Sequence, residues 1–312
     1  MLSSIFSTLF SMRFVITAIR LATPIIFAAI ATFIAASSGI GNIAIESIMT
    51  FAALAGVLGS YLSGSAWVGV LVGMAIGVVT VMLIAFFSMK LGANAFLIMI
   101  ALNTFADSVA IFVMYLMTGE KGTTASLTTP ILGSVDIPII KDIPFIGEAI
   151  SGQYILTYIC WLIVILLYIF IYKTPTGMRM RACGLNADAA RTAGINVEKM
   201  QVLSLVLSGI FAALGGVYLS LNYLKIFSRG MVSGQGWMGV SSNGIAAGNY
   251  WVLILSAFIF AIFRAVAIIF SSNSALPTDL VNAIPYIAVF VILTVVSIIN
   301  YYRVKQGKVE EH

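Results

Sequence analysis

Ionisable and amide side chains recur at helical spacing inside otherwise apolar stretches of this sequence. Asn103 and Asp107 lie four residues apart, so they share one helical face, and Glu46 lies in another apolar stretch. A carboxyl group at membrane depth costs about 3 kcal/mol or more and normally faces the interior of a bundle. Carboxyl and amide groups exchange hydrogen bonds with hydroxyl groups that leave water, so they predict a pathway for a neutral, hydroxylated solute. The candidate pathway residues are Asn42, Glu46, Asn103, Asp107 and Asn243.

Two other interpretations of the acidic residues stay open at this point. Arg264 lies in a third apolar stretch, and pairing with Glu46 or Asp107 would make it an internal clamp between helices. Alternatively, Glu46 and Asp107 are proton or sodium sites of an ion-coupled secondary transporter. A gradient would then drive uptake by the chain alone.

The sequence lacks the motifs expected of an enzyme. The only histidine is His312, and neither H-E-x-x-H nor G-x-S-x-G occurs, so no intramembrane hydrolase is indicated. The phosphate-binding pattern G-x-x-x-x-G-K-[ST] is also missing, so we do not expect this chain to hydrolyse ATP. Cys160 and Cys183 are too few and too poorly spaced for a disulfide or metal framework. We expect no metal and no cofactor.

The elements that position these residues must lie in lipid. The chain of 312 residues is 61% hydrophobic and 9% charged, whereas a soluble domain is about 25% charged. Its apolar runs are continuous, unlike the alternating strands of about 10 residues in a membrane barrel. We therefore predict an all-α integral membrane protein of the cell membrane, a polytopic helical bundle of about 8–10 spans. The apolar runs are 19–37, 43–62, 66–88, 93–117, 154–172, 201–221, 250–271 and 283–301.

Basic residues set the expected topology. The 173–200 loop and the 302–312 tail are rich in Lys and Arg and should be cytoplasmic. The net charge of +5 fits such loops, and no basic patch interleaved with aromatics indicates a nucleic-acid partner. The 118–152 loop is then extracellular, as a structural lid or as a platform for a substrate-binding protein.

The 173–200 loop and the 302–312 tail can both be cytoplasmic only if an even number of crossings separates them, but three apolar runs lie between them. One extra crossing is needed between 201–221 and 250–271, and the short, glycine-rich segment 236–249 is the candidate for a broken or re-entrant segment. The same count places the N-terminus outside. Residues 1–312 then form one membrane domain.

Small residues repeat every four positions in three of the apolar runs. This spacing lets helix backbones approach closely in lipid, so it predicts a compact bundle. The three sets are Ala52, Gly56 and Ser60; Gly69, Gly73 and Gly77; and Ser208, Ala212, Gly216 and Ser220.

The 173–200 loop carries signals for a short helix. Asn186 is a good N-cap, Asp188 falls in the first turn, and Gly194 can end the helix. A helix of about two turns is therefore predicted over 187–193. A plain cytoplasmic loop is the alternative, and the cap favours a docking element.

Three stretches resemble the permease subunits of bacterial ABC importers for branched-chain amino acids, simple sugars and nucleosides. They are GLNADAARTAGINVEKMQVLSLVLSGIFAALGG, SGIGNIAIESIM and LNTFADSVAIFVMYLMTGEKGTTASL, and the third is most similar to the purine nucleoside and simple sugar subgroup. The segment GQGWMGVSSNGIAAGNYW departs from the family because it lacks a common proline, and Arg264 is unusual there.

This resemblance implies a function and a set of partners. The 187–193 helix would be the coupling helix that sits in a groove of a separate ATP-binding subunit. The positions that match the family there are Gly184, Asn186, Ala189, Ala190 and Gly194. A second permease subunit, as a homo- or heterodimer, and an extracellular substrate-binding protein are implied as well. The expected function is the membrane subunit of an ATP-driven importer for a small polar solute, with nucleosides and simple sugars favoured.

Overall fold

The computed structural model describes residues 12–136 and 150–273, together with five single positions between 287 and 298. The expected tail 302–312 therefore lies outside the described residues. So do most of the expected span 283–301 and the middle of the 118–152 loop.

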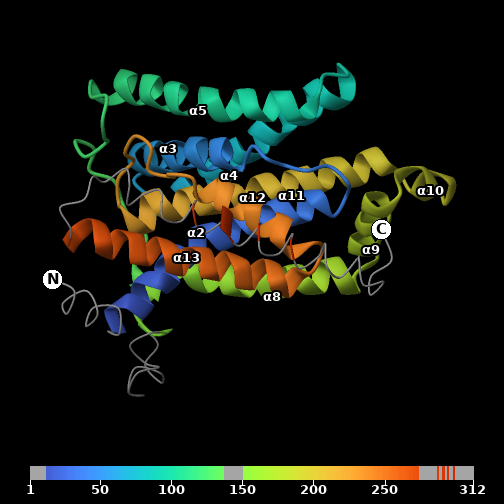
Figure 1. Cartoon of the computed structure of the whole chain (residues 1–312). Coiled ribbons are helices and arrows are strands. Elements are labelled where there is room, and N and C mark those ends of the chain that lie inside the picture. The colour runs from blue at the N-terminus through green and yellow to red at the C-terminus, as the bar shows by residue number, and fades with distance from the viewer. Residues whose placement is uncertain are drawn as a thin grey trace.

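The described chain is a bundle of long apolar helices (Figure 1). Seven of these helices are long and apolar enough to cross a membrane, which confirms the predicted all-α, polytopic class. Two of them continue into a π-helical turn, α4 into Phe86–Lys90 and α11 into Tyr218–Tyr223. The seven helices are α2 (Met12–Ala36), α3 (Ile45–Ser63), α4 (Ala66–Ala85), α5 (Ala95–Thr118), α8 (Ile155–Lys173), α11 (Val197–Val217) and α13 (Tyr250–Asn273).

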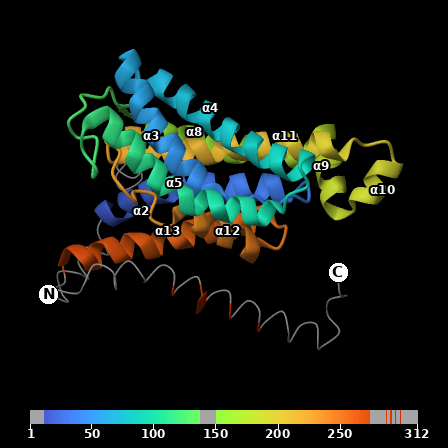
Figure 2. The ribbon, with the colours of Figure 1, turned by 90° about the horizontal axis from the view of Figure 1, so that it is seen from above.

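The crossing helices differ in how deeply they are buried. In the most apolar stretch of α2 and of α11, 72% of the residues are buried, against 17% in α5. Helix α5 accordingly lies along one edge of the bundle in Figure 1, and seen from above in Figure 2 it crosses in front of the other helices. Helices α2 and α11 therefore form the centre of the core, and α5 has a face that the described chain leaves uncovered.

Short elements distinguish the two ends of the bundle. Helices α9 (Pro175–Leu185) and α10 (Ala187–Thr192) lie together at one end, called the α10 end below (Figure 1). The other end carries the antiparallel strands β1 (Ser134–Val135) and β2 (Gln153–Tyr154) and is called the β end.

The first crossing helix begins earlier than its apolar run predicted. Instead of starting near residue 19, α2 begins at Met12 and includes Arg20. The Arg20 guanidinium donates hydrogen bonds to the Gln153 side chain (3.2 Å) and the Gly152 carbonyl (3.1 Å). It also lies 4.7 Å from the centre of the Tyr154 ring. These partners accommodate a charge in the helix, and they place the start of α2 at the β end, opposite to the α10 end.

The chain returns across the bundle between α11 and α13. Residues 224–234 start at the β end, where Ser228 pairs with Thr123. Helix α12 (Gln235–Ala246) then runs to the α10 end, where Gly248 and Arg181 line one cavity. This return supplies the extra crossing that parity required. Most of the predicted broken segment 236–249 is a regular helix.

The small-residue stripes lie where crossing helices touch, as predicted. A Cβ atom on Gly77 of α4 would lie 2.5 Å from the Gly209 carbonyl oxygen of α11. Gly69 likewise faces the backbone of Gly56 on α3, and Gly216 faces the backbone of Met49. At these glycines, helices α3, α4 and α11 therefore approach backbone to backbone, with no room for an added Cβ atom.

We predict that Gly77→Ala lowers the free energy of unfolding by about 1–3 kcal/mol, because the new methyl group overpacks the α4–α11 contact. Gly244→Ala in α12 is the matched control, since a Cβ atom there meets nothing within 4 Å. Thermal unfolding of the purified variants measures the difference. Equal melting temperatures for the two variants would contradict this packing.

Candidate functional site

An unwound segment, residues 37–44, enters the bundle between α2 and α3 along α11. Ser38 pairs with Ser204 of α11, and Asn42 donates to Ser208 Oγ (2.9 Å), one helical turn further from the α10 end. The Asn42 side-chain oxygen accepts from the Ala44 N–H (3.0 Å). Non-helical backbone at membrane depth needs such partners, because lipid offers none.

Asn103 of α5 fixes the point where this segment turns into α3. Its amide nitrogen donates to the Ile43 carbonyl (2.8 Å), and its oxygen accepts from the Ser47 N–H (3.0 Å). One side chain therefore bridges the last unwound residues and the first turn of α3. Asn103 holds backbone here, which the sequence pattern alone did not indicate.

The Glu46 carboxylate caps the start of α12. Its two oxygens accept hydrogen bonds from the N–H groups of Gly234 (2.7 Å) and Gly236 (2.8 Å). The first four N–H groups of a helix have no partner within the helix, and the helix dipole favours negative charge at this end. A Cβ atom on Gly236 would lie 2.7 Å from Glu46 Oε2, so only glycine allows this approach. The intramembrane acid therefore has a structural partner.

Arg264 binds the same turn from α13. Its guanidinium donates to the Ser233 carbonyl (3.1 Å), directly before the residues that Glu46 caps. Within the described residues, Glu46 and Arg264 form no direct ion pair. Both side chains instead bind the backbone of residues 233–236, which links α3 to α13.

The remaining candidate pathway residues lie apart from this cap. Asp107 is one turn beyond Asn103 on α5 and is exposed, as are Thr104 and Ser108 beside it. Asn243 lies near the other end of α12, at the α10 end, in a cavity of ≈ 380 Å³. The structure thus brings Asn42, Glu46 and Asn103 together at the start of α3, and it separates Asn243 from them.

Gln235, the first residue of α12, is a polar residue that the sequence analysis missed. It is 2% exposed, and in the part of the chain that the structure describes its side-chain oxygen has no hydrogen-bond partner. No local sequence signal indicated that Gln235 would be buried, because its burial depends on the position of the start of α12 inside the bundle.

The predicted helix of the 173–200 loop is confirmed as α10. The Asn186 side chain accepts from the N–H groups of Asp188 (3.1 Å) and Ala189 (3.0 Å), and Gly194 adopts φ = +80° after the helix. Ala190 is 4% exposed and packs with Cys183 and Val197, whereas Ala189 is exposed. Of the positions that match the family, Ala189 is therefore the one on the open face of α10.

Helix α9 was not predicted, although its signal was present. Thr174 accepts from the Gly177 N–H (3.2 Å), and Pro175 occupies the first turn, so the residues that end α8 also start α9. Near the other end of α9, a Cβ atom on Gly184 would lie 2.5 Å from the Ser37 carbonyl oxygen. Helix α9 therefore touches the beginning of the unwound segment.

Among the described residues, seven helices long enough to cross a membrane, a buried helix start and a short capped helix between two of these helices are the features of a multi-pass membrane protein. Residues 14–296 match the family described as branched-chain amino acid transport system / permease component, and the chain belongs to this family. Its members are permease subunits of ABC transporters, which lack an ATPase site of their own and work with a separate ATP-binding subunit.

Individual relatives include nucleoside permeases. The nucleoside ABC transporter permease protein NupC of Lactococcus lactis is 26% identical over 87% of this chain and 88% of its own length. The guanosine ABC transporter permease protein NupQ of Bacillus subtilis is 31% identical over 71% of each chain. A relative in Haloferax volcanii with a provisional designation as a glucose ABC transporter permease is 26% identical, over 79% of this chain and 74% of its own.

We predict that Glu46→Ala lowers the free energy of unfolding by about 1–3 kcal/mol, because buried N–H groups of α12 lose their acceptor. Glu46→Gln should cost less, since an amide retains one acceptor oxygen. Glu120→Ala, in an exposed loop, is the control. Denaturant or thermal unfolding measures the three differences, and a Glu46→Ala variant as stable as the control would contradict the cap.

Proposed function

We propose that this chain forms half of the membrane pathway of an ATP-driven importer for nucleosides, with simple sugars as the second candidate. Similarity to a nucleoside permease over 87% of this chain and 88% of the relative carries the proposal. Two further relatives, named for guanosine and for glucose, support the same pair of solute classes. Both solutes are neutral and rich in hydroxyl groups, with which the intramembrane amides and acids can exchange hydrogen bonds.

The pathway runs along the uncovered face of α5. Thr104, Asp107 and Ser108 are exposed there, although a carboxyl group at membrane depth requires a polar partner or water. A second permease subunit, identical or related, covers this face and encloses a water-filled path. The buried oxygen of Gln235, near the Glu46 cap, is a further acceptor for solute hydroxyl groups.

Coupling enters at the α10 end, which faces the cytoplasm in this proposal, while the β end receives a substrate-binding protein. The ATP-binding subunit holds α10 through its open face, including Ala189. Movement of α10 is transmitted to α9, and Gly184 of α9 pushes on the unwound segment at Ser37. That segment leads through Asn42 to Glu46, and thus to the start of α12.

An ion-coupled transporter is the alternative function. Both oxygens of Glu46 already accept hydrogen bonds from α12, so a structural role accounts for this acid without a bound ion. Proteoliposomes separate the two functions. Our proposal predicts uptake of labelled guanosine or ribose only with the ATP-binding subunit and ATP. Gradient-driven uptake by the chain alone would establish the alternative.

We predict that Ala189→Arg lowers ATP-coupled uptake about tenfold or more, because a bulky charge on the open face of α10 blocks docking. Ala93→Arg is the matched control, since Ala93 is exposed in the loop before α5. Uptake and co-purification of the ATP-binding subunit are measured together, with a melting curve to check folding. Normal uptake and normal subunit recovery in the Ala189→Arg variant would contradict docking at α10.

A further inference from the structure

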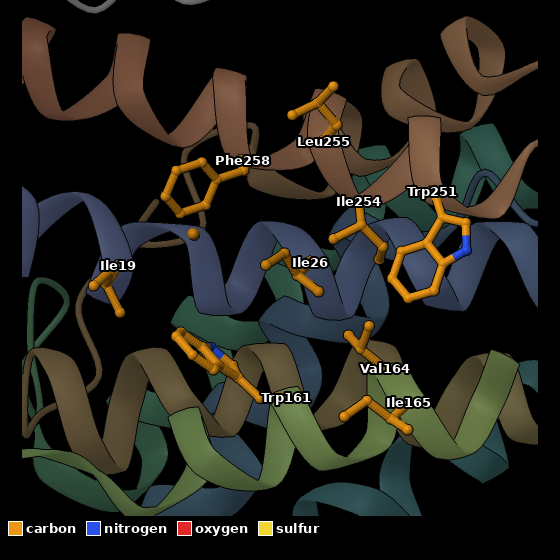
Figure 3. A pocket seen from close by; sticks show the side chains of 10 residues that line it. Ile19, Ile26, Trp161, Val164, Ile165, Trp251, Ile254, Leu255 and Phe258 are labelled. Atoms are coloured by element: carbon orange, nitrogen blue, oxygen red, sulfur yellow. The ribbon is translucent and has the colours of Figure 1, made fainter. Parts of the chain in front are cut away.

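A long apolar groove lies between α2, α8 and α13. Its volume is ≈ 550 Å³, and its walls carry Ile26 from α2, Trp161 and Val164 from α8, and Trp251 and Phe258 from α13 (Figure 3). The positions from Trp251 to Phe258 cover about 10 Å along α13, from the rise of 1.5 Å per residue. One leaflet of a bilayer is about 15 Å of hydrocarbon. The groove thus has the length and chemistry for part of one acyl chain.

A polar cavity lies next to the groove, toward the α10 end, and shares the wall residue Trp251 with it. It has a volume of ≈ 440 Å³ and is lined by Tyr168, Tyr172, Arg181 and Gly248, together with Trp251, which also lines the groove. The Arg181 guanidinium lies 4.6 Å from the centre of the Tyr172 ring. Tyr168 lies against Tyr172 and Trp251, with ring centres 5.0 and 5.2 Å apart. Tyrosine and tryptophan rings of this kind favour the headgroup level of a membrane.

The charge of Arg181 has no acidic neighbour in the described chain. The ion pair found among the described residues joins Asp188 to Arg191 (2.9 Å), and no carboxylate there lies within 4 Å of Arg181. Arg181 is itself exposed. A planar guanidinium presents a fork of donors that matches a phosphate group. The polar cavity beside the apolar groove therefore offers a cation that is available to bind an anion.

We infer that an anionic phospholipid binds here, with its phosphate on Arg181 and one acyl chain in the groove. Charge complementarity selects this occupant, because the cytoplasmic leaflet is the anionic one. The choice of leaflet rests on the proposed orientation of the α10 end, but on no assumption about the solute. The bound lipid joins α9 to α2, α8 and α13, next to the helix that couples to the ATP-binding subunit.

Native mass spectrometry of the full-length chain, in equal amounts of phosphatidylglycerol and phosphatidylcholine, tests the contact between Arg181 and the lipid headgroup. Wild type should prefer phosphatidylglycerol, and Arg181→Gln should reduce this preference about fivefold, since one basic residue near the surface contributes about 1 kcal/mol. Arg179→Gln is the matched control on the same helix, because Arg179 lines neither cavity. Equal preferences in the two variants, or no preference in wild type, would overturn the inference.

A second pair of variants tests the acyl chain. Ile165 and Leu162 of α8 are both 56% exposed, but only Ile165 lines the groove. Ile165→Trp should reduce lipid retention, and Leu162→Trp should leave it unchanged. The apolar run 283–301 is the rival occupant. Efficient disulfide formation between Leu255→Cys and cysteines introduced along that run would show that the chain itself fills the groove, which would also overturn the inference.

Discussion

The arrangement of this membrane bundle depends on one carboxylate placed inside it. Helix α12 starts within the bundle, at a depth where lipid offers its first N–H groups no hydrogen-bond partner. Glu46 accepts from two of them, and its negative charge is favoured by the helix dipole. Charge-assisted hydrogen bonds of this kind are about twice as strong as neutral ones, so they compensate part of the cost of the buried charge. A fixed cap in turn lets α12 lie against α2 and α3.

A continuous set of contacts leads from the surface helix α10 to this cap. Ala190 holds α10 on α9, and Gly184 brings α9 against Ser37. From there the unwound segment is tied to α11 at Asn42 and to α5 at Asn103 before it reaches Glu46. Each step is a close packing contact or a hydrogen bond. Displacement of α10 therefore has a direct structural route into the membrane.

Local signals in the sequence predicted the crossing helices, the small-residue contacts and the cap of α10 at Asn186. Each of these depends on residues within a few positions of one another. The partners of Glu46 were not predictable, because Gly234 and Gly236 are 188 and 190 residues away. For the same reason, Asn103 was grouped with the other amides by residue type, although its role here is to bind the backbone of α3. Asn243 was grouped likewise and lies at the α10 end.

Hydrogen–deuterium exchange at the N–H groups of residues 234–237 measures the Glu46 cap most directly. The account predicts slow exchange in the wild-type chain and exchange about tenfold faster or more in Glu46→Ala, because loss of a cap costs about 1–2 kcal/mol. Residues 187–190, capped by Asn186, provide an internal reference that should not change. Equal exchange at residues 234–237 in the two proteins would contradict the account.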